Sequence, residues 1–284
     1  MDRRAPQLRS ADRAGTDSAG RGGAPVSGGF SGRVALVTGA GRGIGRALAL
    51  ALAEEGAGLG LLARSRAELD EVAEAVWERG SKAVVLRADL GDPEQTAGAA
   101  DRVLAEFGGV DILVNNAAVV WPLGPTSAVD PGEWADAVLV NVVGAFRLTR
   151  ALLPTMLDRG WGRVVNVSSG VVGNPAGMIG MNAYVTSKAA LEAHTVSLAA
   201  ELAGSGITVN TFRPGAVDTA MQAWIRGQSP DDIGAALHER FTRNYDEGSL
   251  IAPESSARAL LTHLHGDRTG EVWSVLPQQT GPSS

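Results

Sequence analysis

The chain has 284 residues, which is enough for one large α/β domain. Its formal net charge is -6, which argues against a nucleic-acid-binding surface. It contains no cysteine, which excludes disulfides and thiolate metal sites and is compatible with a reducing compartment, so we expect a cytoplasmic protein. The four histidines lack metal-ligand spacing and no run of 18 apolar residues occurs, so we expect neither a metal site nor a transmembrane helix.

Residues 1–30 differ in composition from the rest of the chain. They are rich in Arg, Gly, Ala and Ser, and they lack the apolar run that a signal peptide needs. We therefore predict a disordered tail, followed by one domain over residues 31–284. A basic arm for a partner is the alternative, although Asp2, Asp12 and Asp17 dilute its charge.

From residue 33 onward, short apolar segments alternate with helical patterns. The predicted strands cover 33–37, 58–63, 82–88, 110–114, 162–167, 206–211 and 271–275. The predicted helices cover 44–55, 66–79, 93–107, 131–158, 182–204 and 253–265. This alternation predicts a single Rossmann-like, doubly wound domain with a seven-stranded parallel sheet, helices on both faces and ligands at the carboxyl ends of the strands. The remaining stretch, 216–250, is a candidate lid.

The segment Thr38–Gly45 joins the first strand to the first helix. Its sequence is T-G-x-x-x-G-x-G, with glycines at Gly39, Gly43 and Gly45. The common G-x-G-x-x-G register fails because Ile44 and Arg46 occupy the places of its third glycine, and no Walker Lys follows. A strand, a glycine turn and a helix N-terminus together form an anion site, so we predict that this turn binds a cofactor diphosphate; a turn without a ligand is the alternative.

Two arginines favour NADP as that cofactor. The second strand ends at Ala63 and Arg64, where an acidic residue would bind the ribose of NAD, and no carboxylate occurs over 56–67. Arg42, inside the glycine turn, adds a second positive charge. Guanidinium groups bind a phosphate through paired hydrogen bonds, so the sequence predicts NADP; the alternative is that both arginines are solvated surface residues.

The third and fourth strands end in polar residues that can also face the cofactor. Asp89, which precedes Leu90, can accept a hydrogen bond from an adenine amino group, or it can belong to the turn before the next helix. Asn115 and Asn116, followed by Ala117, end the fourth strand. They can hold the turn and line the cofactor cleft, and we favour the structural role.

The predicted helix over 182–204 carries Tyr184 and Lys188, which lie four residues apart and so share one face. An ammonium at about 4 Å stabilises a phenolate by roughly 4 kcal/mol at an effective dielectric of about 20, and a cationic nicotinamide would add to this. The pair can therefore act as a general acid and base. Such a pair also arises by chance on helices.

Two further polar residues belong to the same region. Ser169 follows the fifth strand and can bond a substrate carbonyl or hydroxyl, with Ser168 as the alternative if the register differs by one. Asn141, on the preceding helix, can hold a water against Lys188. A turn serine and a helix-surface asparagine are the simpler interpretations.

Taken together, these motifs resemble the short-chain dehydrogenase/reductase family over residues 31–276. They are the glycine turn, Asn115-Asn116-Ala117, Asn141, Ser169, Tyr184-x-x-x-Lys188 and the P-G-x-x-x-T turn from Pro214 to Thr219. The resemblance implies that Tyr184 transfers the hydroxyl proton, Ser169 polarises the carbonyl, Lys188 binds the nicotinamide ribose and lowers the pKa of Tyr184, and Asn141 anchors a relay water. It also implies a cofactor site made of Gly39, Arg42, Gly43, Ile44, Gly45, Arg64, Asp89, Leu90, Asn116, Ala117, Tyr184, Lys188, Pro214, Gly215, Val217 and Thr219.

The chain departs from the family pattern at two places. Ala118 stands where the family usually has glycine, which removes backbone freedom from that turn. The interval from Ser169 to Tyr184 is longer than the family commonly has, and the extra residues fall in a loop that borders the substrate. Both departures bear on substrate specificity.

The expected activity is that of an NADP-dependent oxidoreductase that interconverts a carbonyl, of ketone or 3-oxoacyl type, and a secondary alcohol. The alternatives are a noncatalytic NADP(H)-binding sensor or scaffold and an NAD-dependent alcohol dehydrogenase. The family analogy suggests a homotetramer or homodimer built on the helices over 131–158 and 182–204. Apolar residues near the predicted site form either a substrate pocket or core and interface: Trp121, Pro122, Leu123, Val171, Val172, Met178 and Met181. The mouth of the site has three candidate residues for an acyl-carrier thioester: Arg226, Arg240 and Arg243.

Overall fold

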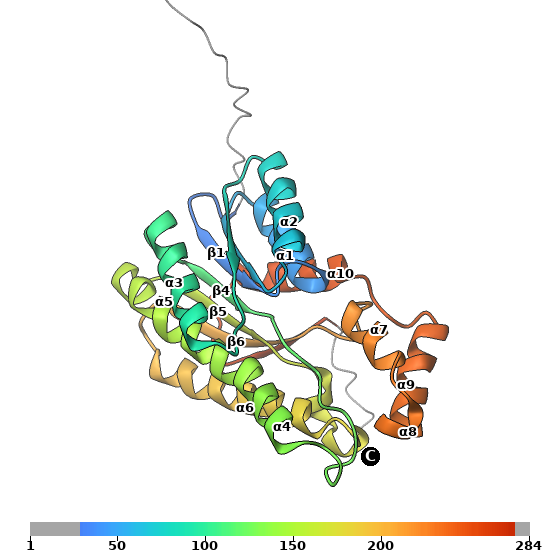
Figure 1. Cartoon of the computed structure of the whole chain (residues 1–284). Coiled ribbons are helices and arrows are strands. Elements are labelled where there is room, and N and C mark those ends of the chain that lie inside the picture. The colour runs from blue at the N-terminus through green and yellow to red at the C-terminus, as the bar shows by residue number, and fades with distance from the viewer. Residues whose placement is uncertain (1–28, 276–284) are drawn as a thin grey trace, which may run out of the picture.

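The computed structural model describes residues 29–275 and contains the predicted seven-stranded sheet (Figure 1). The strands are β1 (Val34–Thr38), β2 (Gly58–Ala63), β3 (Ala83–Arg87), β4 (Ile112–Asn115), β5 (Gly162–Val167), β6 (Ile207–Arg213) and β7 (Val272–Ser274). Their order is β3-β2-β1-β4-β5-β6-β7, and every neighbouring pair is parallel. Strands are added toward one edge of the sheet from β1 to β3, and toward the other edge from β4 onward. The point between β1 and β4 where the order switches opens a crevice at the carboxyl ends of the strands.

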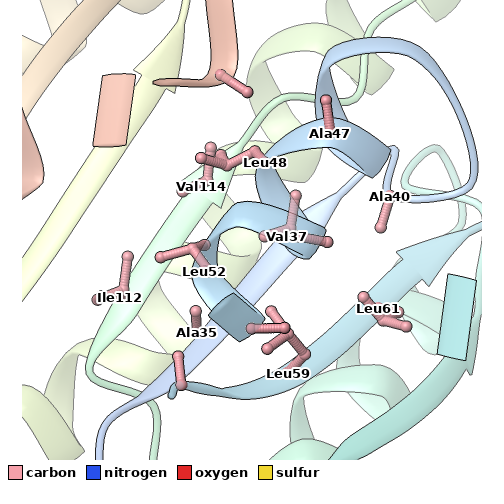
Figure 2. Close-up of a cluster of buried hydrophobic side chains, with 14 of the residues drawn as sticks. Ala35, Val37, Ala40, Ala47, Leu48, Leu52, Leu59, Leu61, Ile112 and Val114 are labelled. Atoms are coloured by element: carbon pink, nitrogen blue, oxygen red, sulfur yellow. The ribbon is translucent and has the colours of Figure 1, made fainter. Parts of the chain in front are cut away.

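The helices that follow the strands cover both faces of the sheet. The longer ones are α1 (Gly43–Glu54), α2 (Arg66–Glu78), α3 (Pro93–Phe107), α5 (Ala145–Arg159), α6 (Asn182–Glu201) and α10 (Pro253–Leu264). One buried cluster joins α1, α2 and α10 to one face, and a second joins α3, α5 and α6 to the other. Figure 2 shows the first cluster, in which the leucines and alanines of α1 pack on β1, β2 and β4.

The strands are buried on both faces, which explains their sequences. All five residues of β1 are buried, and so are all six of β5. A parallel strand covered by helices on both sides needs apolar or hydrogen-bonded residues throughout, so these segments read as continuous apolar runs rather than alternating ones. This pattern is why the strand positions could be predicted closely.

The helical stretch predicted over 131–158 is interrupted in its middle. It consists of α4 (Pro131–Val138), a π-helical segment η1 (Leu139–Gly144) and α5. By length and composition this continuous stretch could cross a membrane, with a mean hydropathy of 1.4 in its most apolar window. It packs against α3 and α6, and a core helix has the same composition, so this is weak evidence for a membrane span.

The predicted lid contains three helices, of which the first two are short. They are α7 (Ala220–Arg226), α8 (Pro230–Ile233) and α9 (Ala235–Asp246), which lie beyond the carboxyl edge of the sheet (Figure 1). Their buried side chains, Ile225, Ile233, Leu237 and Phe241, pack against the loop that follows β5.

Most of the predicted tail lies outside the described residues, but its last residue belongs to the fold. Phe30 is 3% exposed and stacks on His265 with 4.5 Å between the ring centroids. The predicted boundary after residue 30 is therefore too late. A single buried aromatic at the end of a polar segment is a weak sequence signal, because its partner lies far along the chain.

Candidate active site

The turn between β1 and α1 can be built only with glycine at its key positions. Gly39 and Gly43 have φ values of +66° and +55°, in the region that side chains rarely adopt. A Cβ on Gly45 would lie 2.2 Å from the carbonyl oxygen of Gly39. The spacing T-G-x-x-x-G-x-G thus follows from steric necessity.

The same turn leaves the start of α1 open to an anion. Arg42, the N-cap residue, makes no side-chain cap hydrogen bond, and the first turn of α1 holds no acidic residue. Free N–H groups and the positive end of the helix dipole point out of this end. The turn therefore fits the diphosphate of a dinucleotide, with Gly39, Gly43, Ile44 and Gly45 as the residues that would hold it.

Hydrogen bonds from β4 fix the glycine turn in place. The hydroxyl of Thr38 accepts from the backbone N–H groups of Asn116 and Ala117, both at 2.9 Å, and Asn116 Nδ2 donates to the carbonyl of Thr38 at 2.8 Å. Asn115 Nδ2 donates to Asn166 Oδ1 inside the sheet at 2.9 Å. Both amides thus have the structural role that the sequence favoured. Ala118 follows without positive φ, so alanine fits there.

Each arginine predicted to bind a 2′-phosphate faces a carboxylate. Arg42 lies 3.6 Å from Glu68, and Arg64 lies 4.0 Å from Asp89. The arginine side chains are 66% and 65% exposed, so these are weak surface pairs that a phosphate can displace. Glu68 was not predicted from the sequence, because its relevance comes from the approach of its side chain to Arg42.

Asp89 shapes the turn after β3. Its Oδ1 accepts from the N–H of Gly91 at 2.9 Å, and its own N–H donates to Gln95 Oε1 at 3.0 Å. Leu90 is buried against Gly144. These contacts give Asp89 the turn role that was the alternative prediction, and its second carboxylate oxygen is the one that faces Arg64.

Tyr184 and Lys188 lie on the buried face of α6. The Lys188 ammonium nitrogen is 5.7 Å from the centre of the Tyr184 ring and donates to the carbonyl of Val167, at the end of β5, at 2.7 Å. Lys188 is 1% exposed and Tyr184 8%. The helix and the carboxyl end of β5 thus hold the pair at the edge of the crevice.

Burial shifts the proton affinities of both side chains. It raises the pKa of Tyr184 to about 12, against a smaller lowering by a side-chain hydrogen bond with Ser169. It lowers the pKa of Lys188 to about 8, while the charge of Glu192 opposes that shift. In the free protein, burial therefore holds the pKa of the phenol above its ordinary value, and the lowering expected from Lys188 together with a cationic nicotinamide stays a prediction.

The free energy of unfolding should depend on pH through Lys188. From about 8 to about 10 the unfolded chain holds this proton and the folded protein does not, so stability rises with pH, by up to about 3 kcal/mol across the window. Tyr184, whose pKa is raised, contributes the opposite slope from about 10 to about 12. Urea unfolding at a series of pH values measures the rise. Lys188→Met should remove it, and an equal rise in that variant would assign it to other groups.

Ser169, and not Ser168, faces Tyr184. Ser169 lies close enough to the phenol of Tyr184 to lower its pKa, and its hydroxyl accepts from the N–H of Val171 at 3.4 Å. Ser168 is 2% exposed and donates to Glu192 Oε1 at 2.7 Å. The structure thereby chooses between the two serines that the sequence left open.

Asn141 lies in the π-helical segment η1 and is 1% exposed. Its Oδ1 accepts from the N–H of Val119 at 2.8 Å, and its Nδ2 donates to the carbonyl of Val119 at 2.8 Å and to Ser187 Oγ at 3.0 Å. The extra residue in the π turn brings the amide to these partners. The side chain therefore ties the loop after β4 to α6, which is a positioning role rather than that of a helix-surface residue.

The turn after β6 reaches the glycine turn. A Cβ on Gly43 would lie 3.3 Å from Thr219 Cγ2, so Thr219 and the start of α1 are neighbours. Gly215 has a φ of +81°, and Val217 forms a parallel bridge with Ile251. Pro214, Gly215, Val217 and Thr219 thus stand at the same edge as the glycine turn.

The apolar residues near the site are mostly core. Val171, Met178 and Met181 are buried together with Tyr184 under the predicted lid. The longer loop after Ser169 forms two 3-10 turns, η2 (Gly170–Gly173) and η3 (Pro175–Gly177). Among the large apolar side chains of the predicted lid, Ile225 and Phe241 are buried, while Trp224 and Tyr245 are 42% and 53% exposed.

An apolar cavity of about 290 Å³ lies beside this loop. Pro122, Trp134 and Ala183 line it. Trp134 Nε1 donates to Asn182 Oδ1 at 2.9 Å, which closes one side with a satisfied polar pair. Pro122, in the segment after β4, thus lines this cavity, while Val171, Met178 and Met181 on the loop after β5 are core.

Comparison with known proteins matches this architecture. A family model described as short chain dehydrogenase matches residues 33–229. The chain is 36% identical over 231 residues to cis-4-hydroxycyclohexanecarboxylate dehydrogenase of Sinomonas cyclohexanicum, covering 81% of this chain and 88% of that one.

Two solved structures are also similar. An NAD+-bound xylitol dehydrogenase has a TM-score of 0.76 at 30% identity, covering 87% of this chain and 98% of that one. A candidate NAD(P) dependent gluconate 5-dehydrogenase from Beutenbergia cavernae, with NADP at low occupancy, has a TM-score of 0.75 at 34% identity, covering 89% and 97%. One neighbour thus holds NAD+ and the other NADP.

Proposed function

This chain belongs to the short chain dehydrogenase family, oxidoreductases that act on alcohol and carbonyl groups, and from that premise we propose that it interconverts a ketone or 3-oxoacyl substrate and a secondary alcohol with NADP. The observation that carries the proposal is the buried pair of Tyr184 and Lys188, with Ser169 close enough to the phenol to lower its pKa. This pair stands at the same sheet edge as a glycine turn that fits a diphosphate.

The cofactor supplies the redox step, because the nicotinamide gives or accepts the hydride. The protein supplies proton transfer and geometry. Tyr184 Oη gives its proton to the carbonyl oxygen in reduction and takes it back in oxidation. The phenol is protonated in the free protein, as reduction requires, although its raised pKa makes it a weaker acid. In oxidation, the positive charges of Lys188 and of a bound nicotinamide have to lower this pKa.

The neighbouring residues have supporting roles in this proposal. Ser169 Oγ donates a hydrogen bond to the substrate oxygen and orients it. Lys188, held by the carbonyl of Val167, presents its ammonium to the nicotinamide ribose. Asn141 keeps the loop after β4 against α6, and α7 to α9 form a lid over the substrate. The carboxamide of the cofactor would meet Val217 and Thr219.

A panel of ketones, 3-oxoacyl thioesters and secondary alcohols, assayed by NADPH absorbance, tests the proposal. We expect turnover of at least one apolar member, since the residues around Tyr184 are largely apolar. If the protein bound NADP(H) yet turned over no member in either direction, the noncatalytic sensor or scaffold would be the better account.

Arg64→Ala should reverse the cofactor preference. A charge-assisted hydrogen bond to the 2′-phosphate contributes about 1.5–3 kcal/mol, so the ratio of kcat/KM for NADPH over NADH should fall roughly 10- to 100-fold. Glu68→Gln should raise the ratio, because it frees Arg42 from its carboxylate. The control is Arg79→Ala, which breaks another surface pair with Glu54. A wild-type preference for NADH would contradict the NADP assignment.

We also propose that the protein is a homotetramer or homodimer that associates through α5 and α6. Phe146 and Leu157 on α5 and Val196 on α6 are 47%, 45% and 54% exposed. Large apolar side chains exposed on neighbouring helices are typical of a covered surface. Sedimentation velocity would give the oligomeric state, and a monomer at micromolar concentration would contradict this proposal.

A further inference from the structure

Glu192 lies one helical turn beyond Lys188 on α6 and joins three elements. Its Oε1 accepts from Ser168 Oγ at 2.7 Å and from Arg213 Nε at 2.9 Å. Its Oε2 accepts from Arg213 Nη2 at 2.8 Å. A single carboxylate therefore ties α6 to the last residue of β6 and to the residue directly after β5.

Both strand ends tied by Glu192 belong to the candidate active site. Ser168 stands between Val167, whose carbonyl holds the Lys188 ammonium, and Ser169, which lies beside the phenol of Tyr184. Arg213 directly precedes Pro214 and the turn that reaches the glycine turn through Thr219. A shift of Glu192 would move the supports of the pair and of the cofactor turn together.

This contact differs from the surface ion pairs of the chain. The side chains of Glu192 and Arg213 are 13% and 24% exposed, whereas those of Glu54 and Arg79 are 63% and 34% exposed. A bidentate Arg–carboxylate pair with a third hydrogen bond is strong and directional, while an exposed pair contributes little. The network is therefore suited to fixing positions.

We propose that Glu192 is a positioning residue of the active site, which holds the ends of β5 and β6 around Lys188 and Ser169 and, balanced by Arg213, sets the electrostatic potential at Lys188. The inference rests on the proposed function, since it concerns the same proton-transfer pair.

The opposite charges of Glu192 and Arg213 predict an effect on the Lys188 pKa that a purely structural role would not produce. In the described part of the chain, the charged and titratable groups at Lys188 are Tyr184 and Glu192 on α6 and, through Glu192, Arg213 on β6. The end of β5 presents the Val167 carbonyl, and the serines directly after it present hydroxyls. Glu192→Gln removes a negative charge and leaves Arg213 unbalanced, so the pKa of Lys188 should fall. Arg213→Gln leaves the carboxylate unbalanced, so that pKa should rise.

Lysine NMR measures this without any substrate or cofactor. The chain has two lysines, Lys82 and Lys188, so a selectively labelled sample gives two titrating signals. We expect the Lys188 signal to move by about 1 in pKa, downward in Glu192→Gln and upward in Arg213→Gln, which is tenfold in proton affinity. Lys82 is the internal reference.

Kinetics with a substrate found in the panel give the second readout. In Glu192→Gln, kcat for reduction should fall roughly 10- to 100-fold, as expected for misplaced supports of the reacting groups, with little change in the carbonyl KM. On the alkaline side of the pH profile, where Lys188 loses its proton, the pH of half-maximal activity should move down in Glu192→Gln and up in Arg213→Gln. Glu54→Gln, which breaks a cross-element pair away from the carboxyl edge of the sheet, is the control and should leave both readouts unchanged.

Each outcome decides the matter. Shifts of the Lys188 signal in the same direction in both variants, or no shift in either, would overturn the inference. If Glu192→Gln does not fold, two variants replace it. Ser168→Ala should lower kcat while leaving the Lys188 pKa unchanged, and Arg213→Gln should still raise that pKa. A wild-type protein without turnover would refute the proposed function, whereas the lysine titrations would still test this inference.

Discussion

Tyr184→Phe is expected to lower kcat roughly 10³-fold or more while leaving NADP(H) affinity within a few-fold of wild type. A positioned general acid contributes about 10²–10⁴ in rate, and phenylalanine has no proton to give. The ring fills the same buried site, so the packing beneath the lid should survive. Steady-state kinetics and cofactor fluorescence titration measure the two effects.

The chain offers a matched control for this variant. It has two tyrosines, and Tyr245 lies in α9, 53% exposed beneath the guanidinium of Arg226. Tyr245→Phe should leave kcat nearly unchanged. Comparable losses in both variants would point to a general effect on the fold, and full activity in Tyr184→Phe would remove this residue from the chemistry.

Gly45→Ala is expected to cost both stability and cofactor binding. The added Cβ would stand 2.2 Å from the carbonyl oxygen of Gly39 and 2.7 Å from Asn116 Nδ2, so the turn has to shift. Overpacking of this kind costs about 1–3 kcal/mol in the free energy of unfolding. Because the turn would hold the diphosphate, cofactor affinity should fall by at least about tenfold, or about 1.4 kcal/mol.

Gly98→Ala is the matched control for the turn variant. Gly98 lies inside α3, and a Cβ there meets nothing within 4 Å. This variant should gain about 0.5–1 kcal/mol of stability because alanine favours the helix, with cofactor affinity unchanged. If urea unfolding and cofactor titration gave the two variants the same profile, the glycine turn would not be the cofactor cradle.

The sheet and the glycine turn could be predicted because their causes are local. Strands buried on both faces must be apolar along their length, and the spacing Gly39, Gly43 and Gly45 follows from contacts within one turn and its neighbour. The positions of Tyr184 and Lys188 on one face of α6 follow from helix geometry alone. These features needed no knowledge of distant contacts.

The structural features that could not be predicted from the sequence depend on contacts between distant elements. The π-helical segment around Asn141 inserts one residue into an otherwise regular pattern, and its cause is the loop after β4, held through Val119. The choice between Ser168 and Ser169 depends on Glu192, which is far along the chain. The raised pKa of Tyr184 results from its burial among apolar side chains of α7 to α9 and of the loop after β5, which spacing does not reveal.

The lid helices were hard to predict for a different reason. The helices α7 and α8 are short, with seven and four residues, and each has a single buried residue. Helices of this length carry little periodic signal and are marginal without tertiary packing. The longer α9 is amphipathic, with Leu237 and Phe241 buried. Glu68 escaped notice because its relevance comes from its approach to Arg42 rather than from its place in the chain.

The most direct test of the account follows the hydride. Wild-type protein is incubated with NADPH that carries deuterium at the transferable C4 position and with the best ketone of the panel, and the alcohol is analysed by mass spectrometry. The account predicts one deuterium on the carbinol carbon, with product formation dependent on Tyr184. Alcohol without deuterium, or no NADPH-dependent product from any panel member, would contradict it.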